Sequence, residues 1–364
     1  ANVKNAAYDA LTGVASTNNF NEICSLLEKA GNGTVTKLQN AAKAAIAAES
    51  AEQQYHSIAE HLNKTSKAYL YYPLLAQAGN QAAISKLMQE YKGGNKEAAE
   101  QALLKVDNAE MINILYDMAK TKDKEKDAIL RRYLTLTQQS NNTPAAKYLL
   151  YRQALELNPS DAVKKSFISA LGNTRCVPAL NTVAKYLDGE QTKHTAAYAI
   201  KELIGKNENL QAGASEKAIL NKAKDIFTAY KAKGDADAGY ALDEISGILP
   251  KFEENGYEPL SATKKYENFE LCADFRGEGS VFLRSVPEIK LTGDDVQFGE
   301  KAVNVKKDSW NNLEVKVLND RIFIYVNGIK LVENAIMKNI APTGLVAVKS
   351  GQTRDVQIKE LAST

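Results

Sequence analysis

The stretch NFELCADFRGEGSVFLRSVPEIKL, residues 268–291, shows that the C-terminal part of the chain follows a different pattern from the part before it. Apolar and polar residues alternate along it, which is typical of a β-strand with one buried face. The preceding 250 residues are rich in Ala, Leu, Lys and Gln and do not alternate in this way. The alternation divides the side chains between two faces: Phe269, Leu271 and Ala273 on one, and Glu270, Cys272 and Asp274 on the other.

The composition excludes several classes of protein. Charged residues make up 25% of the 364 residues and the formal net charge is +2, so no concentrated basic face for nucleic acid is expected. No run of about 18 apolar residues occurs, and no transmembrane helix is predicted. The opening ANVKNAAYDALTGV lacks the basic and apolar regions of a signal peptide, which leaves open that one was removed before residue 1.

No metal or cofactor site is predicted. Cys24, Cys176 and Cys272 are far apart and odd in number, so neither a disulfide framework nor a CxxC motif is formed, and we expect small buried side chains. His56 and His61 are five residues apart, whereas a helical zinc pair is separated by four. No glycine-rich nucleotide loop and no GxSxG motif occurs.

Residues from about 19 to 250 predict a chain of short helices. Apolar residues recur there at spacings of three and four, and short Gly- or Asn-containing breaks separate segments of about 12 to 18 residues. In NPSDAVKKSFISAL, Ser160 or Asp161 is expected to cap a helix, because its side chain can accept from backbone N–H groups of the first turn.

The helical part also contains an internal repeat. Two segments read as helix end, Gly-Asn turn, apolar helix, Gly turn and Ala-rich helix, and they align Gly79 with Gly172 and Leu87 with Leu180. Residues 174–205, with CVPALNTVAKYL followed by TAAYAIKEL, resemble a HEAT repeat. Stacked repeats of this kind form long binding surfaces, so the solenoid is expected to bind a protein partner or to serve as a spacer.

A linker is predicted in residues 249–267, where Pro250, Gly256 and Pro259 end the helical pattern. The predicted domains are therefore a HEAT-like helical domain at 1–252 and a β-domain at 253–364. Asn327-Gly328 predicts a two-residue hairpin turn. Eight short antiparallel strands imply a sandwich, and they are predicted at 267–275, 279–285, 287–292, 310–318, 321–327, 329–334, 343–349 and 353–361.

Five segments of this region carry a resemblance to a known family. YENFELCADFR, GSVFLR, EIKL, WNNLEVKVLNDRIFIYVNGIKLVE and TGLVAVKSGQTRDVQIKEL follow one another in the order of the 3-keto-disaccharide hydrolases. This is a concanavalin-like jelly-roll family, formerly a domain of unknown function, that is abundant in the Bacteroidetes. The resemblance covers about residues 257–361. It implies a jelly-roll sandwich, a carbohydrate ligand, and a secreted or periplasmic location.

The chain departs from the family pattern at positions that line the family's pocket. Lys290 and Gly293 stand where the family has Gln and Asp, with Asp294 one residue late, and Lys349 stands where it has Gln. The family's His is absent. Glycoside hydrolysis needs an acid and a base on opposite sides of the bond, and the candidates are Glu288 together with Asp294 or Asp295. The resemblance implies the following substrate-binding residues: Arg276, Arg284, Glu288, Lys290 and Lys349.

These observations predict a carbohydrate-related protein in which a helical scaffold carries a non-catalytic sugar-binding or interaction jelly roll. An active hydrolase or lyase of the 3-keto-disaccharide type is the alternative, and a structural fragment of a larger enzyme is the third. Alternation further predicts that Arg284, Glu288 and Lys290 converge on one side of the sheet, either as a polar groove or as an exposed charge ladder.

Overall fold

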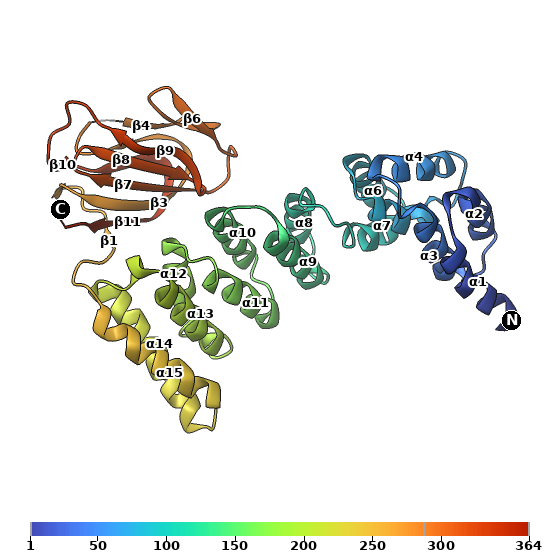
Figure 1. The fold of residues 1–364 in the computed structure, drawn as a ribbon, viewed down its shortest axis with the longest axis horizontal. Coiled ribbons are helices and arrows are strands. Elements are labelled where there is room, and N and C mark those ends of the chain that lie inside the picture. The colour runs from blue at the N-terminus through green and yellow to red at the C-terminus, as the bar shows by residue number, and fades with distance from the viewer. Residues whose placement is uncertain (1, 287, 363–364) are drawn as a thin grey trace. The chain divides into compact units, whose positions relative to one another are not determined.

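The computed structural model describes residues 2–286 and 288–362, and shows a run of helices followed by strands (Figure 1). The α-helices are α1 (Asn2–Val14), α2 (Phe20–Glu28), α3 (Val35–Ile46), α4 (Ala51–Leu62), α5 (Tyr72–Ala78), α6 (Gln81–Lys92), α7 (Lys96–Leu103), α8 (Met111–Lys120), α9 (Lys126–Gln139), α10 (Pro144–Glu156), α11 (Asp161–Gly172), α12 (Val177–Ala184), α13 (Lys193–Lys206), α14 (Ala214–Ala232) and α15 (Ala236–Ile248). Short 3-10 helices are η1 (Thr17–Asn19), η2 (Ala68–Tyr71), η3 (Glu208–Leu210) and η4 (Leu249–Lys251).

The strands lie beyond the last helix. They are β1 (Glu258–Pro259), β2 (Lys265–Tyr266), β3 (Phe269–Phe282), β4 (Glu288–Leu291), β5 (Asp295–Phe298), β6 (Lys301–Asn304), β7 (Asn311–Leu318), β8 (Arg321–Val326), β9 (Ile329–Ile336), β10 (Gly344–Leu345) and β11 (Ala347–Glu360). The predicted order of a helical part followed by an antiparallel β-sandwich is confirmed.

Several helices begin where the sequence supplies a cap. The predicted cap Ser160 accepts a hydrogen bond from the backbone N–H of Val163, and Asp161 begins α11. At α6 the Asn80 side chain accepts from Ala83 in the same way. These side chains satisfy backbone donors that have no partner within the helix.

Packing divides the chain into two compact units after Leu136, called here the first and the second unit. In the first unit α5 packs against α6 and α7, and Leu87 of α6 is fully buried. In the second unit α13 packs against α11, α12, α14 and α15, and Leu180 of α12 is also buried.

The two aligned glycines have different roles. Gly79 ends α5 in the left-handed conformation with φ +59°. Gly172 instead lies at the end of α11, where a Cβ would come within 2.8 Å of Ala199. One glycine is needed for its backbone conformation and the other for close helix packing. The HEAT assignment of the helical region stays a prediction.

The sandwich is built around β3. A nine-stranded sheet contains the order β6-β5-β4-β3-β7-β8-β9, with β11 also paired to β3 and β1 paired to β11. Residues 269–275 of β3 pair with β7, whereas residues 279–282 pair with β4. One long strand therefore contributes to both layers. The strands β2 and β10 form a separate pair.

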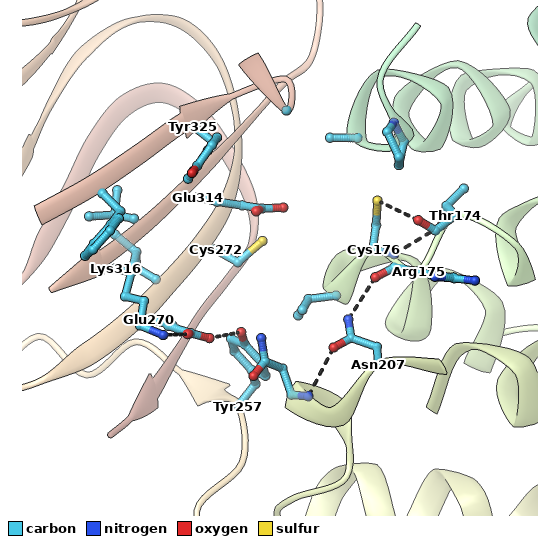
Figure 2. Close-up of a pocket in the computed structure, with 18 of the residues that line it drawn as sticks. Thr174, Arg175, Cys176, Asn207, Tyr257, Glu270, Cys272, Glu314, Lys316 and Tyr325 are labelled. Carbon is cyan, nitrogen blue, oxygen red and sulfur yellow. Dashed lines mark hydrogen bonds and ion pairs between the residues drawn. The ribbon is translucent and has the colours of Figure 1, made fainter. Parts of the chain in front are cut away.

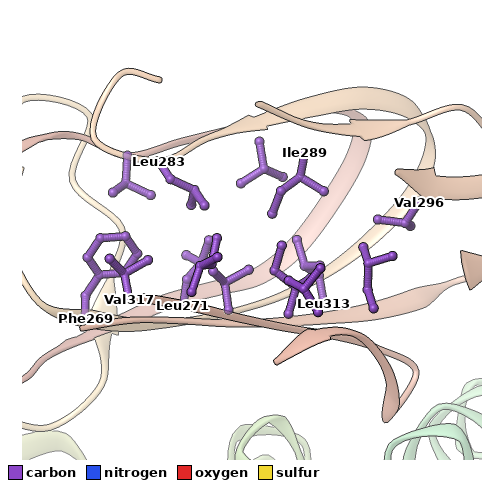
Figure 3. Packing of buried hydrophobic residues seen from close by; sticks show 14 of the residues in the cluster. Phe269, Leu271, Leu283, Ile289, Val296, Leu313 and Val317 are labelled. Atoms are coloured by element: carbon purple, nitrogen blue, oxygen red, sulfur yellow. The ribbon is translucent and has the colours of Figure 1, made fainter. Parts of the chain in front are cut away.

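The apolar core lies between the two layers (Figure 3). Phe269, Leu271 and Leu313 point into it from one layer, and Ile289 and Val296 point from the other. The face of Phe269, Leu271 and Ala273 is buried as the alternation predicted. The opposite face of this layer turns toward the helices, of which α10 contacts β7 and α12 contacts β3.

The strand predictions were correct in position but too fragmented. The predicted strands at 267–275 and 279–285 are one strand, β3, which continues through Gly277 at φ +88°. The strands β5 and β6 lie between residues 292 and 310, where no strand was predicted. Residue 287, the first of one predicted strand, lies outside the described residues. Asn327 and Gly328 have φ of +51° and +75°, which confirms the predicted hairpin turn.

The region around the predicted linker is tied to the helices. The backbone of Glu253 pairs in parallel with Ala212, and Tyr257 donates its N–H to the Glu216 carboxylate at 2.9 Å. The domain boundary between residues 252 and 253 stays a prediction, as does the jelly-roll assignment of the sandwich. Within the described ranges, no helix has the length and apolar character needed to cross a membrane.

Candidate functional site

Arg284 is buried, and its guanidinium donates hydrogen bonds to backbone carbonyls. Nε donates to the Glu267 carbonyl at 2.7 Å, and Nη1 donates to the Asn319 carbonyl at 2.6 Å. Arg284 lies beyond the end of β3 at φ +51°, so strand alternation no longer fixes its direction. It therefore connects loops of the sandwich and is 2% exposed.

Glu288, Lys290 and Lys349 share one outward face of the sandwich and form what we call the charged patch. Ser280 of β3 lies opposite Lys290 on one side and Lys349 on the other, and Phe282 lies opposite Glu288. All three charged residues are exposed. The structure thus brings Glu288 and Lys290 together, as expected, but it does not bring Arg284 to them.

Arg276 and Asp294 are exposed as well. The backbone carbonyl of Arg276 accepts from Ser350 at 3.2 Å, and Asp294 lies in the turn between β4 and β5. None of the sequence-predicted site residues lines the cavity that lies on the other side of the sandwich.

This sheet–helix cavity has a volume of about 740 Å³ (Figure 2). One wall is the outward face of β3, β7 and β8. The other is formed by the first residues of α10, by the segment that leads into α12 and by residues near η3. Its lining includes aromatic rings, carboxylates, amides and two thiols: Thr174, Arg175, Cys176, Asn207, Asn209, Tyr257, Glu270, Cys272, Glu314, Lys316, Phe323, Tyr325 and Glu333.

On the sheet wall, Glu270 is held between two donors. The Lys316 ammonium lies 3.0 Å from Oε1, and the Tyr257 hydroxyl donates to Oε2 at 2.9 Å. Glu270 and Lys316 are direct cross-strand neighbours of β3 and β7. Burial, followed by the negative charge of Glu270, raises the pKa of Tyr257, so its hydroxyl remains a donor.

Glu314 is the second carboxylate of this wall. It lies opposite Cys272 on β3 and opposite Tyr325 on β8. Its carboxyl group points across the cavity toward the helix wall (Figure 2). Burial raises the pKa of Glu314, and the nearby charges of Glu270 and Asp274 raise it further.

The helix wall is held by local hydrogen bonds. Asn207 donates from Nδ2 to the Arg175 carbonyl at 2.8 Å, and the Cys176 N–H donates to Thr174 Oγ1 at 3.3 Å. Burial raises the pKa of the Cys176 thiol to about 12 and that of Cys272 well above its usual value. Burial therefore favours the protonated form of both thiols, whereas a nucleophilic cysteine reacts as the thiolate. The prediction that the three cysteines are buried is confirmed.

A buried ion cluster fixes the sheet against α10 beside the cavity. Asp274 is fully buried and accepts from Tyr148 of α10 at 2.8 Å, from Asn312 at 3.0 Å and from Arg354 of β11 at 3.0 Å. Arg152 of α10 lies 3.5 Å from the same carboxylate. Because side chains from α10, β7 and β11 all donate to this one carboxylate, the two walls of the cavity are held in a defined arrangement.

The sequence contained a partial signal for this site. Alternation placed Glu270 on the outward face of its strand, and the same reasoning applied to residues 310–318 would have placed Glu314 and Lys316 on one face. The helix wall, around Cys176 and Asn207, had no such signal, because it reaches the sheet through tertiary packing. Among the residues that the structure describes, no three His, Cys, Asp or Glu side chains are grouped so as to hold a metal ion.

No family model matches the chain, and no curated protein matches it. Among solved structures, the chain is similar to a proposed glycosyl hydrolase from Parabacteroides distasonis, with 16% sequence identity and a TM-score of 0.23. The match covers 28% of this chain and 73% of that chain. A likeness of this size does not establish a common fold.

Proposed function

We propose that the second unit binds a carbohydrate in the sheet–helix cavity without transforming it. The observation that supports this most is the composition of the sheet wall, where the rings of Phe323 and Tyr325 lie beside Glu270, Glu314 and Lys316. Aromatic rings can cover the apolar face of a sugar, while carboxylates and ammonium groups bind its hydroxyls. The volume is within the range of small-molecule pockets, roughly 300–1,000 Å³.

A glycan array followed by titration calorimetry tests this proposal. We expect Lys316→Ala and Tyr325→Ala to weaken binding about tenfold or more, because each removes a contact from the wall. Lys290→Ala in the charged patch is the matched control and should leave the affinity unchanged. Loss of binding in Lys290→Ala, with Lys316→Ala unaffected, would place the sugar on the patch that the sequence indicated.

A second function, hydrolysis, is supported by the contrast between the two carboxylates. Glu314 has a raised pKa, as a general acid near neutral pH requires, whereas Glu270 forms an ion pair with Lys316. They are diagonal neighbours on one sheet face and both line the cavity, so a glycosidic bond bound there would have two carboxyl groups beside it.

Turnover assays separate the two functions. If the protein is a hydrolase, wild type should cleave a glycoside or 3-keto-glycoside, and Glu314→Gln should abolish cleavage while retaining binding. Glu288→Gln and Asp294→Asn test the residues that the family resemblance indicated. Binding by wild type without any turnover supports the non-catalytic function.

The remaining elements of the proposal rest on the resemblances. The family resemblance supports a periplasmic or extracellular location, and the helical repeats support a protein partner on the surface of the solenoid. Pull-down with surface variants of the solenoid and fractionation of the native cells would test these two points.

A further inference from the structure

The carboxylates around the sheet–helix cavity differ in whether a cation pairs with them. Glu270 is paired with Lys316 at 3.0 Å, and Glu333 is paired with Lys330 at 2.9 Å. Behind the wall, Asp274 is paired with Arg354 at 3.0 Å. Within the described part of the chain, Glu314 has no cation within ion-pair distance.

The positions of the nearby cations explain why Glu314 has no partner. Lys316 lies two residues along β7 and is engaged by Glu270. Arg175 lines the cavity, but its side chain is directed away from the sheet (Figure 2). The cross-strand neighbours of Glu314 are Cys272 and Tyr325, and neither carries a positive charge.

We propose that the cavity selects a sugar that carries a protonated amine, and that this amine donates to the Glu314 carboxylate. The inference rests on the proposed carbohydrate binding and deepens it. An ammonium group supplies the cation that the wall lacks, and a charge-assisted hydrogen bond to a half-buried carboxylate is among the stronger polar contacts. The Glu270–Lys316 pair and the rings then contact the rest of the sugar.

The helix wall contains the feature that most opposes the binding of a cation in the cavity. The first turns of α10 and α12 begin at the cavity, at Pro144 and Val177, and helix N-termini favour anions. Thr143 already caps α10 by accepting from Ala146 at 3.1 Å. An acidic sugar is therefore the competing ligand, and the experiment includes one.

Three β-1,4-linked disaccharides with the same skeleton test the selection by titration calorimetry on the full chain. They are the glucosamine disaccharide, its N-acetylated form and cellobiose, which carry an ammonium, an amide and a hydroxyl at C2. A glucuronic acid disaccharide is the anionic probe. We expect the glucosamine disaccharide to bind at least about tenfold more tightly than cellobiose.

Glu314→Gln keeps the shape of the side chain and removes its charge, so it should abolish this preference by weakening binding of the glucosamine disaccharide far more than binding of cellobiose. Glu288→Gln neutralises an exposed carboxylate outside the cavity and should keep the preference. Equal affinity for the three disaccharides, or tighter binding of the glucuronic acid disaccharide, would overturn the inference while carbohydrate binding stands. Binding of none of the four probes, together with an array without positives, would overturn the proposed function as well.

Discussion

At the scale of single residues, Glu314 occupies an unfavourable place for a carboxylate. Burial raises its pKa in the folded protein above the value of about 4.3 in an unfolded chain. A group whose folded pKa is raised contributes stability below the unfolded pKa, and that contribution is lost as the pH rises through the folded pKa. We therefore expect Glu314→Gln to have a higher Tm than wild type at pH 7.5, and the difference to narrow as the pH falls toward about 4.

Thermal melts over this pH range check the prediction. Glu333→Gln is the control, because Lys330 and Tyr325 lower the pKa of Glu333 and hold it in its ionised form. This control should not raise the Tm at pH 7.5. A Tm of Glu314→Gln that equals wild type at every pH would show that Glu314 is not buried as described.

Leu87 and Leu180 test the internal repeat at the same scale. Both side chains are buried, with 0% and 2% exposed. Truncation of either to Ala should lower the free energy of unfolding by about 2–5 kcal/mol, because it removes buried methyl groups and leaves a cavity. Leu26→Ala, at a residue that is 40% exposed, is the control. Urea denaturation measures all three, and losses below about 1 kcal/mol at both buried sites would contradict the alignment.

The site residues show where strand alternation in the sequence was sufficient to predict the direction of a side chain and where it was not. Alternation correctly separated Glu270 from its buried neighbours Phe269 and Leu271, because a strand directs side chains to two faces with period two. The same rule misplaced Arg284, since its positive φ turns the chain after β3. Sequence alone also did not show that helices cover the outward face, because that contact joins segments far apart in the chain, as where Tyr148 of α10 meets Asp274 of β3.

At the scale of elements, the ion cluster around Asp274 connects α10, β3 and β11. Removing one member of a buried ionic cluster leaves the others uncompensated, which costs about 3–5 kcal/mol. We expect Asp274→Ala to destabilise the second unit by this amount, since Arg152 and Arg354 would lose their shared carboxylate. Asp274→Asn retains two acceptor positions and should be less harmful.

Chemical denaturation, followed by the fluorescence of Trp310, measures this effect, because Arg354 lies 4.1 Å from the indole ring. Glu190→Ala breaks an exposed pair with Lys193 and should change the stability little. An Asp274→Ala protein as stable as this control would show that the cluster does not hold the sheet to α10.

The elements themselves were predictable to different degrees. Helices with side-chain caps and the Asn327-Gly328 hairpin followed from local chemistry and appear where expected. The strand β3 was divided in two by the prediction, because Gly277 and Gly279 usually indicate a break. In the structure Gly279 lies so close to the Lys349 carbonyl that a Cβ would clash, so glycine permits close pairing with β11 there.

At the scale of the whole molecule, the division into units makes a prediction about proteolysis. The second unit contains α10–α15 together with the sandwich, and Lys359 of β11 donates to the Asn209 carbonyl at 3.1 Å. We expect limited proteolysis to yield a stable fragment that begins near residue 137. Mass spectrometry of the products checks this, and a surviving fragment that begins near residue 256 would instead support the boundary predicted from the sequence.

The pairing of β3 with β11 also has a consequence for synthesis of the chain. The register runs from Phe269 opposite Glu360 to Phe282 opposite Ala347. The central strand β3 therefore cannot complete its pairing until β11 has been synthesised. Until the ribosome has released Glu360, β3 has an unpaired edge along its full length, and edges of this kind invite pairing with other chains. The helices translated earlier can already be folded at that point. The α10 and α12 helices, which contact β7 and β3 in the finished fold, would then be available for these strands to pack against before β11 completes the sheet.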